Sequence, residues 1–305
     1  MAEKVFKSGF VALLGRPNVG KSTLMNHILK QKIAAVSPRP QTTRRRQLGI
    51  LTTREAQIIF VDTPGIHQAS NSLGQFMNEE ALSMLQDADV LVWLVDASKP
   101  PNEEDRMLAE SMERVDPLPP VILALNKVDQ LQEDMIETQQ ENYQKLMPQA
   151  VMVRLSALQG DGVPQLLALL EQNLPEGPRY YEAEQITDLY EREIAVDLIR
   201  EAALYHLRDE VPHEMAVRLD SYEDRGDSAA YIAATLFVNR DSHKGIVIGK
   251  GGSMLKTIGS SARKEMEALT GRKIYLELRV KVGKNWRDDP EMLRRLGYIS
   301  TRSLE

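Results

Sequence analysis

Gly15-Arg-Pro-Asn-Val-Gly20-Lys21-Ser22 is the most informative segment for the fold of this chain. It follows an apolar run, residues 9–14, that is typical of a buried strand, and it opens a helical stretch over residues 23–29. A strand, a glycine-rich turn and a helix in this order form the context that a phosphate-binding loop requires. The glycines let backbone N–H groups turn toward phosphates, and the helix N-terminus adds partial positive charge there. An incidental glycine-rich turn explains the segment less well than a nucleotide-phosphate site.

Several oxygen-bearing side chains are placed to hold Mg²⁺ beside these phosphates. Ser22 can offer its hydroxyl to the ion, while Lys21 can reach the β- and γ-phosphates. Asp62-Thr-Pro-Gly65 ends a second apolar run, which places Asp62 to hold the ion through water and Gly65 to present a backbone N–H to the γ-phosphate. Thr42 and Thr43 precede that run, and we expect the Thr43 hydroxyl to complete the ion's coordination.

Asn126-Lys127-Val128-Asp129 indicates which base is bound. It ends the apolar run 121–125, which has the character of a buried strand. A carboxylate at Asp129 can accept hydrogen bonds from N1–H and the 2-amino group of guanine, whereas adenine has no 2-amino group and an acceptor at N1. Such a site discriminates by roughly 10⁴-fold or more. Ser156-Ala157-Leu158 follows another apolar run, and a backbone N–H there can contact guanine O6.

Each of these motifs is short, and Asn or Asp beside a strand often marks only a turn. Five of them in the expected order make coincidence a poor explanation. The predicted GTP-binding residues are Gly15, Arg16, Pro17, Asn18, Val19, Gly20, Lys21, Ser22, Thr23, Asp62, Thr63, Pro64, Gly65, Asn126, Lys127, Asp129, Ser156, Ala157 and Leu158. The predicted catalytic residues are Lys21, Thr43, Gly65 and Asn18, and the predicted Mg²⁺ ligands are Ser22, Thr43 and, through water, Asp62.

Length and composition agree with a two-domain protein of a reducing compartment. At 305 residues the chain is long enough for about two domains, each with its own core. It contains no cysteine, which excludes a disulfide framework and a thiolate metal site. The N-terminus lacks the apolar core of a signal peptide, and no apolar stretch is long enough to predict a membrane span.

The spacing of apolar runs predicts an α/β domain followed by an α+β domain. Strands alternate with helices near residues 21–30, 74–87, 103–114, 133–146 and 162–172, which indicates a mostly parallel sheet with helices on both faces. Residues 47–61 break the alternation and predict a hairpin along one edge. We predict a GTPase domain over 1–174, a linker over 175–187, a KH RNA-binding domain over 188–298 and a tail over 299–305.

Charge is divided sharply within the C-terminal part. Residues 181–239 contain 14 acidic and 5 basic residues, whereas residues 240–287 contain 12 basic and 4 acidic residues. A local basic surplus of this size is typical of contact with a polyanion, although a solvated charged face is the alternative.

The basic segment contains Ile246-Val-Ile-Gly-Lys-Gly-Gly252, whose last four residues form a GxxG pattern. A GxxG loop lets a nucleic-acid backbone pass close to the protein main chain. The pattern is weak alone, but a helix, two strands and a short helix precede it, and a helix and a strand follow. This order is that of a KH domain, and an anionic membrane surface would explain the GxxG less well. The predicted RNA-binding residues are Lys244, Ile246, Ile248, Gly249, Lys250, Gly251, Gly252 and Lys256, with Leu255 and Ile258 also expected to line the groove for bases.

The whole chain resembles the Era family, within the TrmE–Era–EngA-type group of GTPases. The resemblance rests on the motifs above in one chain with a C-terminal KH domain, and extends through Asn285-Trp-Arg-Asp288 and Leu296-Gly-Tyr298. The related family with tandem GTPase modules would need a second phosphate loop, which this sequence lacks. The resemblance implies GTP hydrolysis to GDP with Mg²⁺, binding near the 3′ end of 16S rRNA, and a role in assembling the 30S subunit. It also implies a monomeric cytoplasmic protein with a peripheral fraction at the inner membrane.

The sequence predicts slow intrinsic hydrolysis. Ras-like enzymes carry Gln directly after DxxG, whereas Ile66 here can neither orient nor activate water. His67 is a weak alternative as a base, since a loop histidine is usually only solvated. Related GTPases with Asn at the position of Asn18 use it to hold K⁺, and the resemblance extends that expectation to this chain.

Two other functional classes remain open at this point. An ATP-driven nucleic-acid motor would share the phosphate loop and the basic segment but would not need Asp129. An RNA-binding scaffold whose nucleotide is mainly structural would keep every motif, and it would bind GTP without repeated turnover.

Overall fold

The apolar runs of the first half of the chain pair into one sheet. The computed structural model describes residues 5–37, 39, 42–188, 191–226 and 228–298, and within them this sheet has six strands in the order β2-β3-β1-β4-β5-β6. Every neighbouring pair is parallel except β2 with β3, which form the edge hairpin that the sequence predicts. The strands are β1 Lys7–Leu14, β2 Gln47–Thr52, β3 Ala56–Asp62, β4 Val90–Asp96, β5 Val121–Asn126 and β6 Val151–Arg154.

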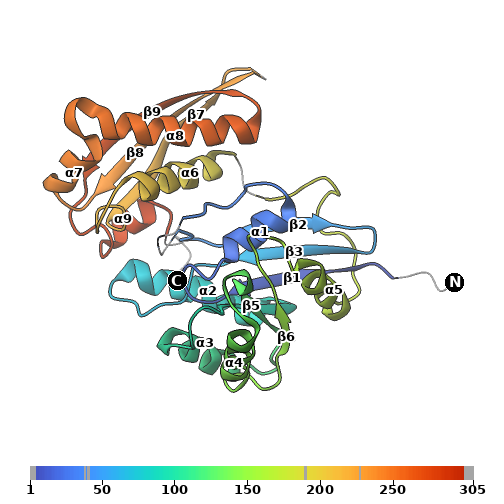
Figure 1. Ribbon diagram of the computed structural model, residues 1–305. Coiled ribbons are helices and arrows are strands. Elements are labelled where there is room, and N and C mark those ends of the chain that lie inside the picture. The colour runs from blue at the N-terminus through green and yellow to red at the C-terminus, as the bar shows by residue number, and fades with distance from the viewer. Residues whose placement is uncertain (1–4, 38, 40–41, 189–190, 227, 299–305) are drawn as a thin grey trace. The chain divides into compact units, whose positions relative to one another are not determined.

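Helices cover both faces of this sheet (Figure 1). On one face, α1 and α5 pack on alternate residues of the strands, and on the other face α2, α3 and α4 pack on the remaining residues. Because side chains alternate along a strand, both sets of strand residues are buried, which explains the continuous apolar runs. The helices are α1 Lys21–Leu29, α2 Ser72–Asp87, α3 Glu103–Glu113, α4 Glu133–Gln144 and α5 Val163–Asn173, with a short 3₁₀ turn, η1, at Val128–Gln130.

This topology brings the motifs together at one edge. In parallel sheets, ligands bind beyond the carboxyl ends of the strands, at the point where the strand order reverses. Here β1 lies between β3 and β4, so the chain reverses direction across the sheet after β3. The phosphate loop follows β1, Asp62 ends β3 and Asn126 ends β5.

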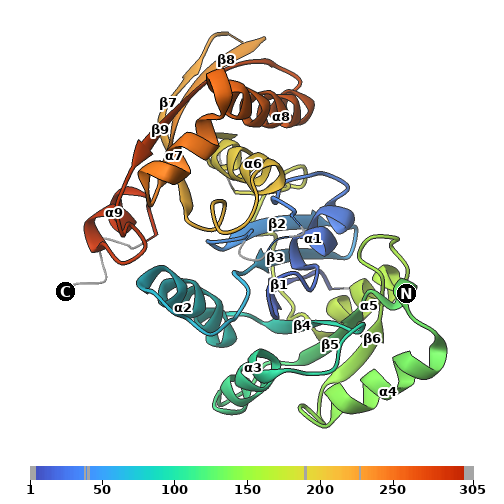
Figure 2. The ribbon, with the colours of Figure 1, turned by 60° about the vertical axis from the view of Figure 1, so that its left-hand side comes forward.

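The C-terminal part forms a second sheet of three strands, in the order β7-β8-β9, among the residues described. The pair β7 and β8 is antiparallel and the pair β8 and β9 is parallel. Figure 2 shows α6, α7 and α8 on one side of this sheet, and their apolar residues share one core with it. The elements are α6 Glu191–His206, β7 Met215–Asp224, β8 Ala229–Val238, α7 Asp241–Ile248, η2 Lys250–Gly252, α8 Ser253–Thr270, β9 Lys273–Val282 and α9 Pro290–Arg295.

The predicted element order of the C-terminal part is confirmed, and one helix was missed. The short helix α9 is signalled by Asp289, whose side chain accepts hydrogen bonds from two following amides, and by Pro290 at its first position. Residues 189–190, directly before α6, lie outside the described residues.

The described residues form two compact units. The first contains residues up to 34, 43–68 and 77–188, and the second contains 35–42, 69–76 and the residues from 189 onward. Two segments that follow nucleotide motifs in the sequence therefore belong to the C-terminal unit. None of the helices in the described part of the chain has both the length and the apolar character needed to cross a bilayer.

Candidate functional site

The phosphate loop closes tightly around its own backbone. Gly15 and Gly20 have φ angles of +141° and +106°, a region that glycine enters without steric cost. The side chain of Lys21 is buried, and its Nζ donates hydrogen bonds to the carbonyl oxygens of Gly15 and Arg16, both at 3.0 Å. Burial lowers the pKa of Lys21 to about 8, although the nearby Asp62 carboxylate opposes this shift. The loop thus holds one ammonium group where phosphate charge would stabilise it.

Three side-chain oxygens that could coordinate a metal ion lie together at the start of α1. The Ser22 hydroxyl donates to Asp62 Oδ2 at 2.6 Å, the Thr43 hydroxyl donates to the same oxygen at 3.2 Å, and the two hydroxyl oxygens lie 3.0 Å apart. Hydroxyl and carboxylate oxygens suit Mg²⁺, which proteins commonly bind through one or two carboxylates together with substrate phosphates. The Thr42 hydroxyl instead donates to the carbonyl of Arg39. The donor set therefore fits the ion and favours Thr43 over Thr42.

The DxxG turn packs directly on the phosphate loop. The amide of Ile66 donates to the Gly15 carbonyl at 3.2 Å, and a Cβ added at Gly65 would lie 2.5 Å from the backbone nitrogen of Pro17. Ile66 is buried and carries no polar group, so it cannot orient water. The Nδ1 of His67 lies 2.9 Å from the Gly65 carbonyl oxygen, an arrangement that suits a protonated Nδ1 donating within the turn.

Asn126 connects three motifs through its side chain. Its Nδ2 donates to the Val19 carbonyl at 2.6 Å, and its Oδ1 accepts from the Ala157 amide at 2.8 Å. Asp129 follows on η1 with its side chain exposed. Because the Ala157 amide already donates to Asn126, the amide of Leu158, a residue that is 69% exposed, is the candidate donor to guanine O6.

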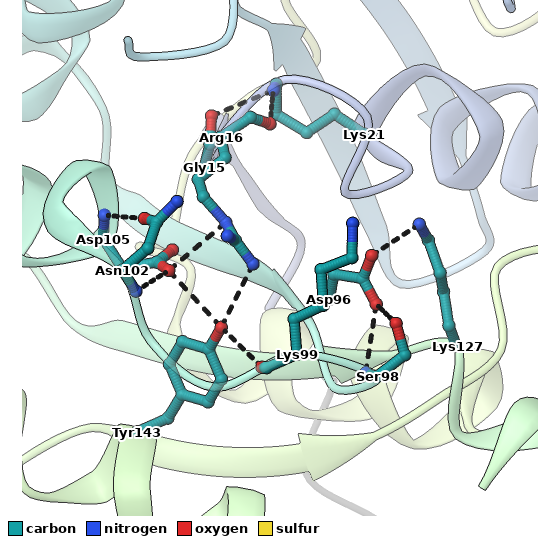
Figure 3. A network of polar contacts seen from close by, with 10 residues as sticks. All are labelled: Gly15, Arg16, Lys21, Asp96, Ser98, Lys99, Asn102, Asp105, Lys127 and Tyr143. Carbon is teal, nitrogen blue, oxygen red and sulfur yellow. Dashed lines mark hydrogen bonds and ion pairs between the residues drawn. The ribbon is translucent and has the colours of Figure 1, made fainter. Parts of the chain in front are cut away.

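A polar network beneath these motifs was not expected from the sequence (Figure 3). Arg16 Nε lies 3.2 Å from Asp105 Oδ2, and its Nη2 donates to the Tyr143 hydroxyl at 3.3 Å. Lys127 Nζ lies 2.8 Å from Asp96 Oδ2. The sequence signal for Asp105 was the pair Asn102 and Asp105, which forms a capping box at the start of α3.

The pKa values of the two carboxylates in this network, Asp105 and Asp96, are shifted in opposite directions. Burial raises the pKa of Asp105 above its ordinary value, although the Asn102 amide and Arg16 oppose the shift. Burial acts in the same direction on Asp96, but hydrogen bonds from Lys127 and Ser98 outweigh it and hold the pKa of Asp96 below its ordinary value. Asp96 is therefore the better-stabilised anion.

The GxxG loop of the second unit is open. It joins α7 to α8, and Gly249, Gly251 and Gly252 have φ angles of +73°, +60° and +82°. Lys250 and Lys256 are exposed, whereas Lys244 and Ile248 are half-buried. Ile246 is 49% exposed, so its apolar side chain is accessible for contact with a base.

One expectation for this groove was wrong. Ile258 is fully buried in the core between the helices and the sheet, and Leu255 packs partly against the same core. On α8, Ile258 lies on the face that carries Ala262 and Met266, spaced by four residues, so the helical period turns it away from the loop.

The chain matches two protein families and is similar to solved structures over nearly its whole length. Residues 10–127 match the family described as 50S ribosome-binding GTPase, and residues 210–287 match the KH domain family. The chain is similar to the crystal structure of Era in complex with MgGDPNP and nucleotides 1506–1542 of 16S ribosomal RNA, with 38% identity and a TM-score of 0.92 over 97% of this chain and 100% of that one. It is equally similar in sequence to a substituted Aquifex aeolicus Era bound to GDP and AlF₄⁻, with 38% identity, a TM-score of 0.91 and the same coverage.

Proposed function

Because the chain belongs to the Era family of GTPases with a C-terminal KH domain, we propose that it is a GTP-hydrolysing switch that binds 16S rRNA near its 3′ end and acts in small-subunit assembly. The observation that carries this proposal is similarity over 97% of the chain to an Era solved with both a GTP analogue and 16S rRNA nucleotides. The chain is a GTPase that uses guanine nucleotide and Mg²⁺.

At the nucleotide site, this chain's contribution is positioning and charge. Lys21 would meet the β- and γ-phosphates, and the Gly65 amide would meet the γ-phosphate. Ser22, Thr43 and Asp62 would hold Mg²⁺, which supplies positive charge at the phosphate oxygens when bound. Asp129 would accept from the guanine base. Since Ile66 carries no group that can orient water, intrinsic hydrolysis is slow.

Potassium is the proposed source of additional charge. Asn18 is exposed on the phosphate loop, where it has a φ angle of +64°, and its side-chain oxygen is the proposed ligand of a monovalent cation. GTPase rates in K⁺ and in Na⁺ at equal ionic strength test this assignment. Equal rates would remove it.

The bound nucleotide can influence the KH unit through two segments, residues 35–42 and 69–76, which follow the phosphate loop and the DxxG motif in the sequence. Residues 35–42 and 69–76 belong to the C-terminal compact unit. Within that unit the Leu73 amide donates to the Arg287 carbonyl at 3.0 Å, and the Ser72 amide donates to Asp288 Oδ1 at 2.9 Å. Nucleotide-dependent order in these segments is thus the proposed link to RNA binding.

Affinity for RNA in two nucleotide states tests the proposal. A labelled oligonucleotide from the 3′ end of 16S rRNA should bind about tenfold more tightly in one state, GTP analogue or GDP, than in the other, a coupling of about 1.4 kcal/mol. A scrambled oligonucleotide is the control. Identical binding in both states would leave the alternative, a scaffold whose nucleotide is mainly structural, as would the absence of repeated GTP turnover.

Binding to the assembled 30S subunit, a monomeric state, and a cytoplasmic location with a peripheral inner-membrane fraction complete the proposal. They rest on the family resemblance alone. Co-sedimentation with 30S subunits, light scattering and cell fractionation test the three points separately.

A further inference from the structure

The β4–α3 loop, together with the last residue of β4 and the first turn of α3 (residues 96–105), contacts both halves of the nucleotide site (Figure 3). It contains none of the motifs that bind phosphate, magnesium or base. One of its ends meets the phosphate loop at Arg16, and its other end meets the guanine motif at Lys127. This arrangement is additional to the Asn126 side chain, which joins the same two motifs from another direction.

The phosphate end of this β4–α3 loop is buried. Asp105 and Tyr143 are completely buried, and Arg16 is 9% exposed. The three side chains form a closed triangle, since the Tyr143 hydroxyl also lies 3.4 Å from Asp105 Oδ2. The backbone carbonyl of Arg16 accepts from Lys21 Nζ, so the position of Arg16 bears directly on the phosphate-binding lysine. Removing one member would leave buried polar groups without partners.

The base end of the β4–α3 loop is held by both backbone and side chains. The Ala97 amide donates to the Asn126 carbonyl at 2.9 Å, next to Lys127. Asp96 accepts from Lys127 and, through its other oxygen, from the Ser98 hydroxyl at 2.6 Å. Lys127 is therefore held at the foot of the η1 turn that carries Asp129.

The middle of the loop is restrained as well. The Tyr143 hydroxyl donates to the Lys99 carbonyl at 3.3 Å, and Pro100 and Pro101 follow with fixed φ angles. The Tyr143 ring meets Trp93 of β4 edge to face, at 6.2 Å between centroids. A displacement at one end of the loop is thus not absorbed by a flexible middle.

We propose that the β4–α3 loop fixes the position of the phosphate loop relative to the guanine motif, with Asp96, Asp105 and Tyr143 as positioning residues. The inference rests on the proposed guanine site. A nucleotide occupies both motifs at once, so its affinity depends on their alignment, as for any ligand with two linked contacts. Loosening the loop would allow phosphates and base each to bind, but no longer both in their best geometry.

Comparing GDP with inosine diphosphate (IDP) measures that alignment. IDP lacks the 2-amino group and so forms one hydrogen bond fewer with Asp129. The main variant is Tyr143→Phe, which keeps the packed ring and removes only the hydroxyl, and Asp105→Asn is the second variant. The control is Glu110→Gln on the outer side of α3, where the side chain is 65% exposed. Dissociation constants for GDP, IDP and ADP are measured at a temperature well below the melting temperature of each variant, so that all the protein is folded.

We expect Tyr143→Phe to weaken GDP binding by about tenfold and IDP binding by about threefold, so that the preference for GDP falls about threefold. The control should leave both constants unchanged. If Tyr143→Phe weakens GDP and IDP by the same factor, Tyr143 acts only locally on the phosphate loop or on stability, and the inference is overturned. Equal binding of GDP and ADP by the unaltered protein would instead overturn the guanine site itself.

Discussion

The two glycine-rich loops of this chain, residues 15–22 and 249–252, differ in what surrounds them. A Cβ added at Gly15 would lie 2.2 Å from the Leu94 carbonyl oxygen, and one added at Gly20 would lie 2.3 Å from Asn126 Nδ2. A Cβ added at Gly251 or Gly252 would meet no atom within 4 Å. Both loops use glycine for backbone conformation. The phosphate loop also needs it for space at Gly15 and Gly20, whereas the GxxG loop needs it for space only at Gly249, where an added Cβ would lie 2.7 Å from the backbone nitrogen of Met254.

This difference matches the ligands. A nucleotide phosphate is small and is enclosed by backbone amides, so the loop that binds it is packed into the protein on its other side. An RNA strand is long and passes over the surface, so its loop must stay open on the side that faces the strand. An enclosed loop links binding to folding, whereas an open loop allows binding to change with little effect on stability.

The largest expected effect is that of Gly15→Ala. The new methyl group would collide with backbone at a φ angle of +141°, so we expect the free energy of unfolding to fall by on the order of 4 kcal/mol and nucleotide binding to be lost. Urea unfolding and GDP titration measure the two effects. A variant with unchanged stability would show that the phosphate loop is not enclosed in solution.

Gly251→Ala is the matched change in the open loop. Its methyl group meets no protein atom, so the cost to stability is that of a left-handed alanine, about 1 kcal/mol. The methyl group would project where an RNA backbone passes, and we expect RNA affinity to fall about tenfold with unchanged GDP affinity. A loss of GDP affinity would contradict the separation of the two loops.

Salt dependence should also separate the two regions. Lys250 and Lys256 are exposed. RNA affinity falls as salt rises, and each Lys→Gln change should make the plot of log affinity against log salt less steep, by about 0.7 in slope. GDP affinity, set by enclosed contacts, should not respond to either change. Fluorescence titrations at several KCl concentrations provide both slopes, and an unaltered RNA slope would exclude phosphate contact by these lysines.

The smallest expected effect concerns acid. The pKa of Asp96 is lowered in the folded protein, so its stabilisation is present above the unfolded pKa and is lost as pH falls through the folded pKa. Asp96→Asn should therefore cost about 1 kcal/mol at pH 7 and clearly less at about pH 3, which is below the unfolded pKa of about 3.9. Melting temperatures of both proteins at the two pH values test this, and an equal difference at both would exclude ionised Asp96 as the source.

The sequence was a better guide to the nucleotide motifs than to what supports them. The segment 15–22, Asp62 and Asn126 are recognisable because phosphate and guanine chemistry constrains residue type and order along the chain. Arg16, Asp105 and Tyr143 meet only through packing of α3 and α4 on the sheet, and no local pattern records such a meeting. Ile258 illustrates the same limit, because its helix could have turned either apolar edge toward the groove.

Asp105 has two partners that belong to different levels of the structure. Its Oδ2 accepts a hydrogen bond from the Asn102 amide, and this bond caps the first turn of α3. The same Oδ2 also lies beside the Arg16 guanidinium of the phosphate loop. The same oxygen atom therefore caps α3 and, on our proposal, supports ligand affinity. A mutational screen for either property alone would assign this residue to that property, and glutamate, one methylene longer, is poorly suited to keep both.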